Sequence, residues 1–91
     1  MPKFVIEREI PGLGGSTAEE LRAVAGKSNA VLSELAPAAQ WVQSYVTDDK
    51  MYCVYVADDA ETVREHARRG GFPADSVARV AAVVDPTTAE G

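Results

Sequence analysis

Apolar and polar residues alternate over the first ten positions of the chain. Phe4, Ile6 and Ile10 alternate with a second set that includes Lys3, Glu7 and Glu9, which is the period of two typical of a half-buried strand. Pro11 and the glycines that follow it then break the regular structure. The pattern therefore predicts a first strand over residues 3–10.

The apolar spacing changes to three and four residues in the next segment, which indicates an amphipathic helix. Ser16 and Glu19 have the spacing of a capping box, so we expect this helix to start beside them. Pro37 marks its end, because proline disfavours helical backbone in the residue before it. The stripe expected to face the core comprises Leu21, Val24, Ala25, Val31, Leu32 and Leu35.

Two apolar runs follow, with a short polar turn between them. We expect strands over residues 40–47 and 50–57, joined as an antiparallel hairpin because their connection is so short. Regular alternation would place the side chains of the earlier strand on two faces, with Trp41, Gln43 and Tyr45 opposite Val42, Ser44 and Val46. In the later strand it would separate Met51, Cys53 and Tyr55 from Tyr52, Val54 and Val56.

The last third of the chain predicts one more helix and one more strand. Asp58 and Glu61 have capping-box spacing, and the helix they open should stop at the glycine pair 70–71. The valine-rich residues 77–84 predict the fourth strand. Residues 86–91 are expected to form a flexible polar tail, which leaves one domain over residues 1–85.

The order strand, helix, strand, strand, helix, strand predicts an α+β fold, the ferredoxin-like βαββαβ sandwich. In this fold a four-stranded antiparallel sheet carries two helices on one face. The other face is uncovered in a monomer, and here either face would carry aliphatic or aromatic residues. We therefore expect a homodimer through the sheet face, with any ligand cleft at or beside that interface.

Composition narrows the classes of partner. The net charge of −5 over 91 residues argues against nucleic acid, whose phosphates are bound by clustered Lys and Arg. The apolar runs are too short for a membrane span and the N-terminus lacks a signal-peptide pattern, so we expect a cytoplasmic protein without a membrane partner. The lone cysteine, Cys53, agrees with a reducing compartment.

A few side chains are candidates for chemistry. His66 is the only histidine and could serve as a general base or a nitrogen ligand, or else as a histidine at the core boundary. Glu7 and Glu9 share one face of a regular strand, so their carboxylates could converge on a cation. They could equally be solvated charges that protect the strand from aggregation.

The aromatic residues of the hairpin are candidates for the wall of a small-molecule site. Cys53 lies between apolar residues in the middle of a strand, where a packed, inert thiol is the alternative to a ligand contact. The ligand-binding residues expected from this pattern are Trp41, Tyr45, Tyr52, Tyr55 and Cys53.

Three segments together resemble a family of small bacterial ferredoxin-like proteins catalogued as a domain of unknown function. They are residues 1–8 (MPKFVIER), the hairpin 45–55 (YVTDDKMYCVY), and residues 64–67 (REHA) with 71–75 (GFPAD). Some members of that family are nickel-binding or nickel-responsive. The resemblance therefore implies a ferredoxin-like fold, a dimer and a divalent metal such as nickel, for which His66, Glu7 and Glu9 are this chain's candidate ligands.

Three functions agree with these observations. The first is a dimeric protein that binds a small ligand or a divalent metal, with a nickel-related role implied by the resemblance. The second is a small cofactor-independent enzyme, similar to ferredoxin-like monooxygenases or isomerases, in which a carboxylate or His66 handles protons in a dry pocket. The third is a structural or regulatory dimerisation module that needs no pocket.

Overall fold

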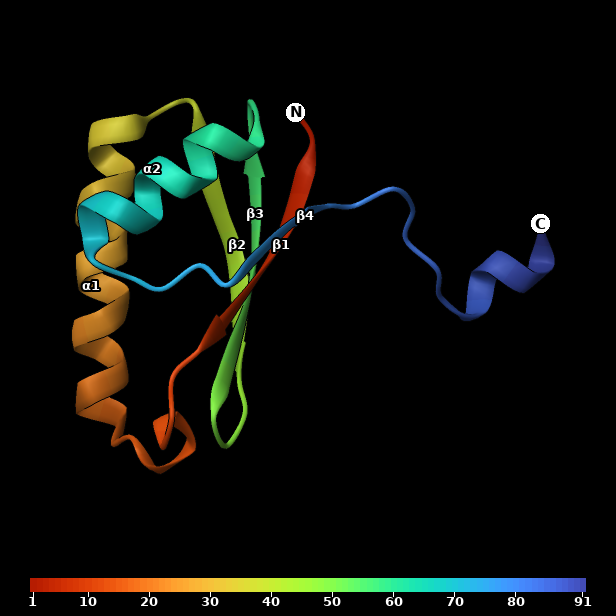
Figure 1. Cartoon of the computed structure of the whole chain (residues 1–91). Coiled ribbons are helices and arrows are strands. Elements are labelled where there is room, and N and C mark those ends of the chain that lie inside the picture. Colours follow the sequence, from red (N-terminus) through yellow and green to blue (C-terminus); the bar gives the residue numbers. More distant parts are fainter.

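The computed structural model describes residues 1–91 and contains the predicted βαββαβ order (Figure 1). The strands form one antiparallel sheet in the order β2-β3-β1-β4. Their bounds are β1 Lys3–Glu9, β2 Ala39–Val46, β3 Lys50–Ala57 and β4 Ser76–Arg79. The ferredoxin-like α+β fold expected from the sequence is confirmed.

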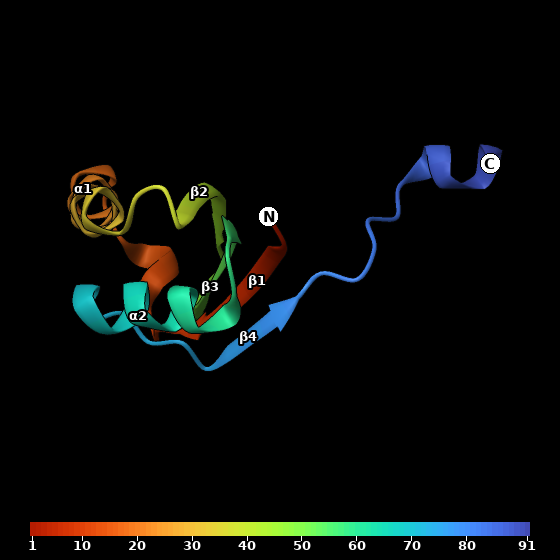
Figure 2. The same cartoon turned by 90° about the horizontal axis from the view of Figure 1, so that it is seen from above.

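Both long helices lie on the same side of the sheet, so the other side is open (Figure 2). They are α1, Ala18–Leu35, and α2, Ala60–Gly70. Two short 3-10 helices complete the chain, η1 at Leu13–Gly15 and η2 at Pro86–Glu90. The segment after β4 leaves the domain and carries η2 away from it (Figures 1 and 2). None of the helices has the length and hydropathy required to span a bilayer.

The N-cap of each long helix lies one residue after the predicted cap. Thr17, not Ser16, is the N-cap of α1, and its Oγ1 accepts a bond of 3.1 Å from the backbone N–H of Glu20. Likewise Asp59, not Asp58, caps α2 through a 2.8 Å bond from the N–H of Thr62. In both places two residues of capping type are adjacent in the sequence, so spacing alone did not distinguish them.

The fourth strand is shorter than predicted. It ends at Arg79 rather than at Val84, and Val83 and Val84 are 66% and 78% exposed. The strand β4 stops there because it pairs antiparallel with β1, and β1 begins at Lys3. The N–H of Val80 bonds the carbonyl of Lys3 at 2.8 Å, and beyond it no partner strand continues.

A β-bulge in β2 changes which side chains share a face. Trp41 pairs with Tyr55 and Gln43 pairs with Val54, so Val42 has no partner in the ladder. The strand predicted as regular is therefore not regular, and the expectation that Trp41, Gln43 and Tyr45 share a face is wrong. The bulge places Trp41 on the helix side together with Ser44 and Val46, which pair with Cys53 and Met51 of β3.

The core lies between the helices and the inner face of β1 and β3. The predicted alternation of β3 is confirmed, because Met51, Cys53, Tyr55 and Ala57 are buried and the residues between them are half-buried on the open face. In β1 the inner positions form a buried series of Phe4, Ile6 and Arg8. A charged side chain thus occupies a core position.

Candidate functional site

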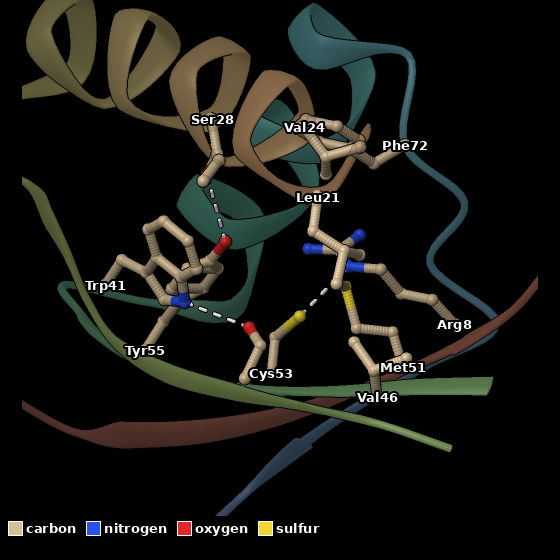
Figure 3. Close-up of a pocket in the computed structure, with 12 residues that line it drawn as sticks. Arg8, Leu21, Val24, Ser28, Trp41, Val46, Met51, Cys53, Tyr55 and Phe72 are labelled. Atoms are coloured by element: carbon tan, nitrogen blue, oxygen red, sulfur yellow. Dashed lines mark hydrogen bonds between the residues drawn. The ribbon is translucent and has the colours of Figure 1, made fainter. Parts of the chain in front are cut away.

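A pocket of about 180 Å³ lies between α1 and the covered face of the sheet (Figure 3). Nine of its twelve lining residues are hydrophobic, so its wall is largely apolar. The sequence led us to expect a cleft at or beside a dimer interface on the open sheet face, whereas this pocket lies on the covered side of the sheet. The lining residues are Arg8, Leu21, Val24, Ala25, Ser28, Trp41, Ser44, Val46, Met51, Cys53, Tyr55 and Phe72.

Two local features create this space. The side of α1 that faces the sheet carries the small residues Ala25 and Ser28 at the pocket, and these do not fill the gap to the strands. The β2 bulge turns Trp41 inward, where its ring meets that of Tyr55 edge-on at 6.5 Å between centroids. The indole N–H of Trp41 donates to Ser44 Oγ at 3.0 Å, which holds the ring at the pocket wall.

Arg8 is the only charged residue of the pocket, and it is only 2% exposed. Its Nε donates to Cys53 Sγ at 3.4 Å and its Nη1 donates to the backbone carbonyl of Pro73. The guanidinium lies over the ring of Phe72, with 5.5 Å from Cζ to the ring centroid. Its Nη2 has no hydrogen-bond partner, and none of the ion pairs of the chain includes Arg8.

A buried polar chain joins α1, α2 and β3 beside the pocket. Ser28 Oγ lies 3.1 Å from His66 Nε2 and 3.4 Å from the hydroxyl of Tyr55. Burial lowers the pKa of His66, and the charge of Arg8 lowers it further, so this imidazole is neutral at pH 7. Burial also raises the pKa of Tyr55. In this state all three side chains are neutral hydrogen-bonding groups.

The Ser28–His66 pair resembles part of a nucleophile–base arrangement but is incomplete. In such sites a third group orients the histidine through its second nitrogen. His66 Nδ1 is buried without a hydrogen-bond partner. The pair therefore acts as a polar contact between the helices, in agreement with a core-boundary position for His66.

The predicted ligand-binding residues fall into two groups. Trp41, Cys53 and Tyr55 line the pocket together, from two neighbouring strands. Tyr45 and Tyr52 pair across β2 and β3 on the open face, away from it. Because side chains alternate along a strand, Tyr52 cannot share a face with its neighbour Cys53.

The candidate metal ligands are not brought to one point. Glu7 and Glu9 lie on the open face of β1, whereas His66 is buried under α2 on the covered side. Glu7 Oε1 is paired with Lys50 Nζ at 2.6 Å. Throughout the chain, no three His, Cys, Asp or Glu side chains are arranged to hold a metal ion.

Sequence reasoning did not identify Arg8, Ser28 and Phe72 as site residues. The hydrophobic periodicity of the sequence contained a signal for two of them, Arg8 and Ser28. Arg8 continues the period-two series of Phe4 and Ile6, so it is a charge at a core position of the strand. Ser28 lies on the apolar stripe of α1, three residues after Ala25. Phe72 had no such signal, because its place beside Arg8 depends on the loop after α2.

Known proteins share this fold. The crystal structure of SCO4226 from Streptomyces coelicolor A3(2) matches with a TM-score of 0.76 and 21% sequence identity, over 90% of this chain and 99% of that chain. A comparison with curated proteins finds no match. The family model described as "Nickel responsive protein SCO4226-like" matches residues 4–80, which is most of the chain. The resemblance seen in the sequence is thereby confirmed, and the chain belongs to the SCO4226-like family of nickel-responsive proteins.

Proposed function

We propose that this protein binds a small organic molecule in the pocket between α1 and the sheet. The observation that carries the proposal is a preformed cavity of about 180 Å³ with nine hydrophobic lining residues and three polar ones. Small-molecule sites are typically concave, mostly apolar and equipped with a few polar groups. An apolar cavity of about 150 Å³ holds benzene, so this pocket suits a substituted aromatic ring or an aliphatic body of similar size.

The rim of the pocket is accessible to a ligand. Val46 is 39% exposed, and Val24 and Trp41 are half-buried. These three residues come from α1 and from β2 at the edge of the sheet. A ligand entering past them would contact the indole of Trp41, which is the only tryptophan of the chain. Its fluorescence is therefore a direct reporter of binding.

The family description raises a divalent metal as the alternative occupant, but the residues of the pocket do not fit one. The guanidinium of Arg8 places a buried positive charge there. The only imidazole of the chain is hydrogen-bonded to Ser28 through Nε2. A stable site would need several donor atoms converging at about 2 Å from the ion, and the predicted carboxylates lie across the sheet. We therefore propose an organic ligand for this pocket.

A thermal-shift screen tests the proposal, because a ligand that binds only the folded state raises the melting temperature. We expect small aromatic molecules such as toluene, indole and phenylacetate to include at least one that raises Tm and changes Trp41 fluorescence. NiCl₂ is screened in parallel. If nickel alone raises Tm, or if no compound does, the organic-ligand proposal is contradicted.

A pair of variants makes the screen specific to the pocket. Ala25→Phe introduces a ring into the cavity and should abolish the ligand response, because Ala25 lines it. Ala23→Phe places the same ring on the exposed side of the same helix and should leave the response unchanged. An Ala25→Phe protein that still responds like the wild type would show that the ligand binds elsewhere.

We further propose that the chain forms a homodimer through the open face of the sheet. This face carries the half-buried Val5, Tyr52, Val54 and Val56, and no element of the chain covers it. The exposed Tyr45 extends this apolar surface onto β2. A symmetric sheet-to-sheet contact would remove these side chains from water.

A further inference from the structure

We infer that the pocket selects an organic acid, whose single carboxylate pairs with Arg8 while its apolar body lies against Trp41 and Tyr55. The inference rests on the proposed function, since it names the ligand class of the same pocket. It starts from the state of one side chain. Arg8 is positively charged and only 2% exposed, and its Nη2 has no hydrogen-bond partner.

The charge of Arg8 has no counterpart in the chain. A guanidinium stays protonated in proteins, and a buried charge is costly unless a charge of opposite sign is near it. The four ion pairs of the chain join Lys50 to Glu7, Arg68 to Glu65, and Arg69 to Glu34 and Glu65. Arg8 instead contacts a thiol, a carbonyl and an aromatic ring, none of which carries a negative charge.

The contacts that Arg8 makes leave one of its donor nitrogens unused. Cys53 and Pro73 occupy Nε and Nη1, and the ring of Phe72 supports the flat guanidinium. Nη2 is thereby the donor left over, on a side chain that lines the pocket. Guanidinium and carboxylate groups are planar and match each other closely, which makes this charge-assisted hydrogen bond stronger than a neutral one.

The two ends of the pocket differ in chemistry. Figure 3 shows Arg8 at one end beside Leu21, Met51 and Phe72, with Trp41 at the other end. A carboxylate at Arg8 would thus extend its apolar part toward the aromatic rings. The neighbouring hydroxyls of Ser28 and Tyr55 bond each other at 3.4 Å, a long bond that either group could exchange for a ligand oxygen.

A singly charged acid fits the pocket better than a phosphate ester. Arg8 is the only cation among the lining residues, and nine of the twelve are hydrophobic. A phosphate carries up to two negative charges and several strong acceptor oxygens, which one guanidinium would leave largely unpaired. A monocarboxylate balances the charge of Arg8 one to one.

The test compares a matched acid and amide by titrating Trp41 fluorescence and by calorimetry. Phenylacetate and phenylacetamide have nearly the same shape, but only the first is charged. We expect phenylacetate to bind wild-type protein about 10- to 100-fold more tightly, the range of a charge-assisted hydrogen bond. Arg8→Met should reduce the ratio to about one, whereas Arg64→Met, at an exposed arginine of α2, should leave it unchanged.

Each other outcome has a definite meaning. Equal binding of acid and amide to the wild type would overturn the organic-acid inference and leave the proposed pocket function intact. Failure of phenylacetate, phenylacetamide, toluene and indole all to bind would overturn both. Tighter binding of phenyl phosphate than of phenylacetate would overturn the monocarboxylate assignment. If Arg8→Met does not fold, the acid-to-amide ratio of the wild type still decides the question.

Discussion

The hydroxyl oxygen of Ser28 on α1 lies 3.1 Å from Nε2 of His66 on α2, so one buried hydrogen bond connects the two helices beside the pocket. The same hydroxyl lies 3.4 Å from Tyr55 on β3. A single small side chain thereby links both helices and the sheet. It also lines the cavity, so stability and pocket geometry depend on the same group.

Removal of this hydroxyl should therefore destabilise the fold. Ser28→Ala leaves His66 Nε2 and the Tyr55 hydroxyl without their partner inside the protein, and we expect a loss of about 1–3 kcal/mol in the free energy of unfolding. Urea denaturation measures it. Ser33→Ala is the control on an exposed part of the same helix, with an expected change within about 0.5 kcal/mol. Equal effects of the two substitutions would contradict the role given to Ser28.

Stability should fall in mild acid because of His66. Burial, and then the charge of Arg8, lower its pKa in the folded state below the value of about 6.5 expected in the unfolded chain. The unfolded chain therefore binds more protons between those two pKa values, so the free energy of unfolding rises with pH there. The stability that depends on a neutral His66 is therefore fully present above about pH 6.5 and is lost as the pH falls below this value.

Urea denaturation at pH 7.5, 6.5 and 5.5 would measure this dependence, and His66→Gln should flatten it. Proton NMR of the single imidazole gives the folded-state pKa directly. A folded pKa above 6.5 would mean that His66 is solvated or paired with an anion, contrary to the buried site described above.

Two helical glycines should respond to alanine in opposite ways. A Cβ at Gly70 would clash with the ring of Phe72, which lies under the guanidinium of Arg8, so Gly70→Ala must displace that ring. We expect it to destabilise the protein by about 1–3 kcal/mol and to weaken ligand binding. On α1, a Cβ at Gly26 would have no atom within 4 Å, so Gly26→Ala should stabilise the protein by about 0.5–1 kcal/mol. Thermal unfolding distinguishes them, and a neutral Gly70→Ala would contradict the tight packing of Phe72.

The proposed dimer predicts an effect of charge on the open sheet face. Val54→Lys places a cation in the middle of the apolar surface on β3, so it should convert a dimer into a 9.7 kDa monomer in light scattering coupled to size exclusion. Ala30→Lys, on the exposed side of α1, is the matched control and should leave the mass unchanged. A monomeric wild type, or a dimeric Val54→Lys protein, would contradict this interface.

Much of the fold could be predicted from short-range patterns. The alternation in β1 predicted that Glu7 and Glu9 share one face, and the turn after β2 predicted the hairpin, including the bounds of β3. The candidate site was less predictable. Trp41, Cys53 and Tyr55 were identified from their chemistry, yet their meeting in one pocket required the bulge at Val42. No local feature of the sequence predicts that Val42 is the residue without a partner in the β2–β3 ladder.

The sequence by itself thus determined the order of elements, the antiparallel hairpin and the ferredoxin-like class, because periodicity and turn residues act over a few positions. Only the tertiary structure decided which sheet face the helices cover and where the pocket lies. It also decided that Arg8 is buried beside Phe72 without a carboxylate partner. These features depend on strand register and on contacts between residues more than sixty positions apart, such as Arg8 with Pro73, which local patterns do not encode.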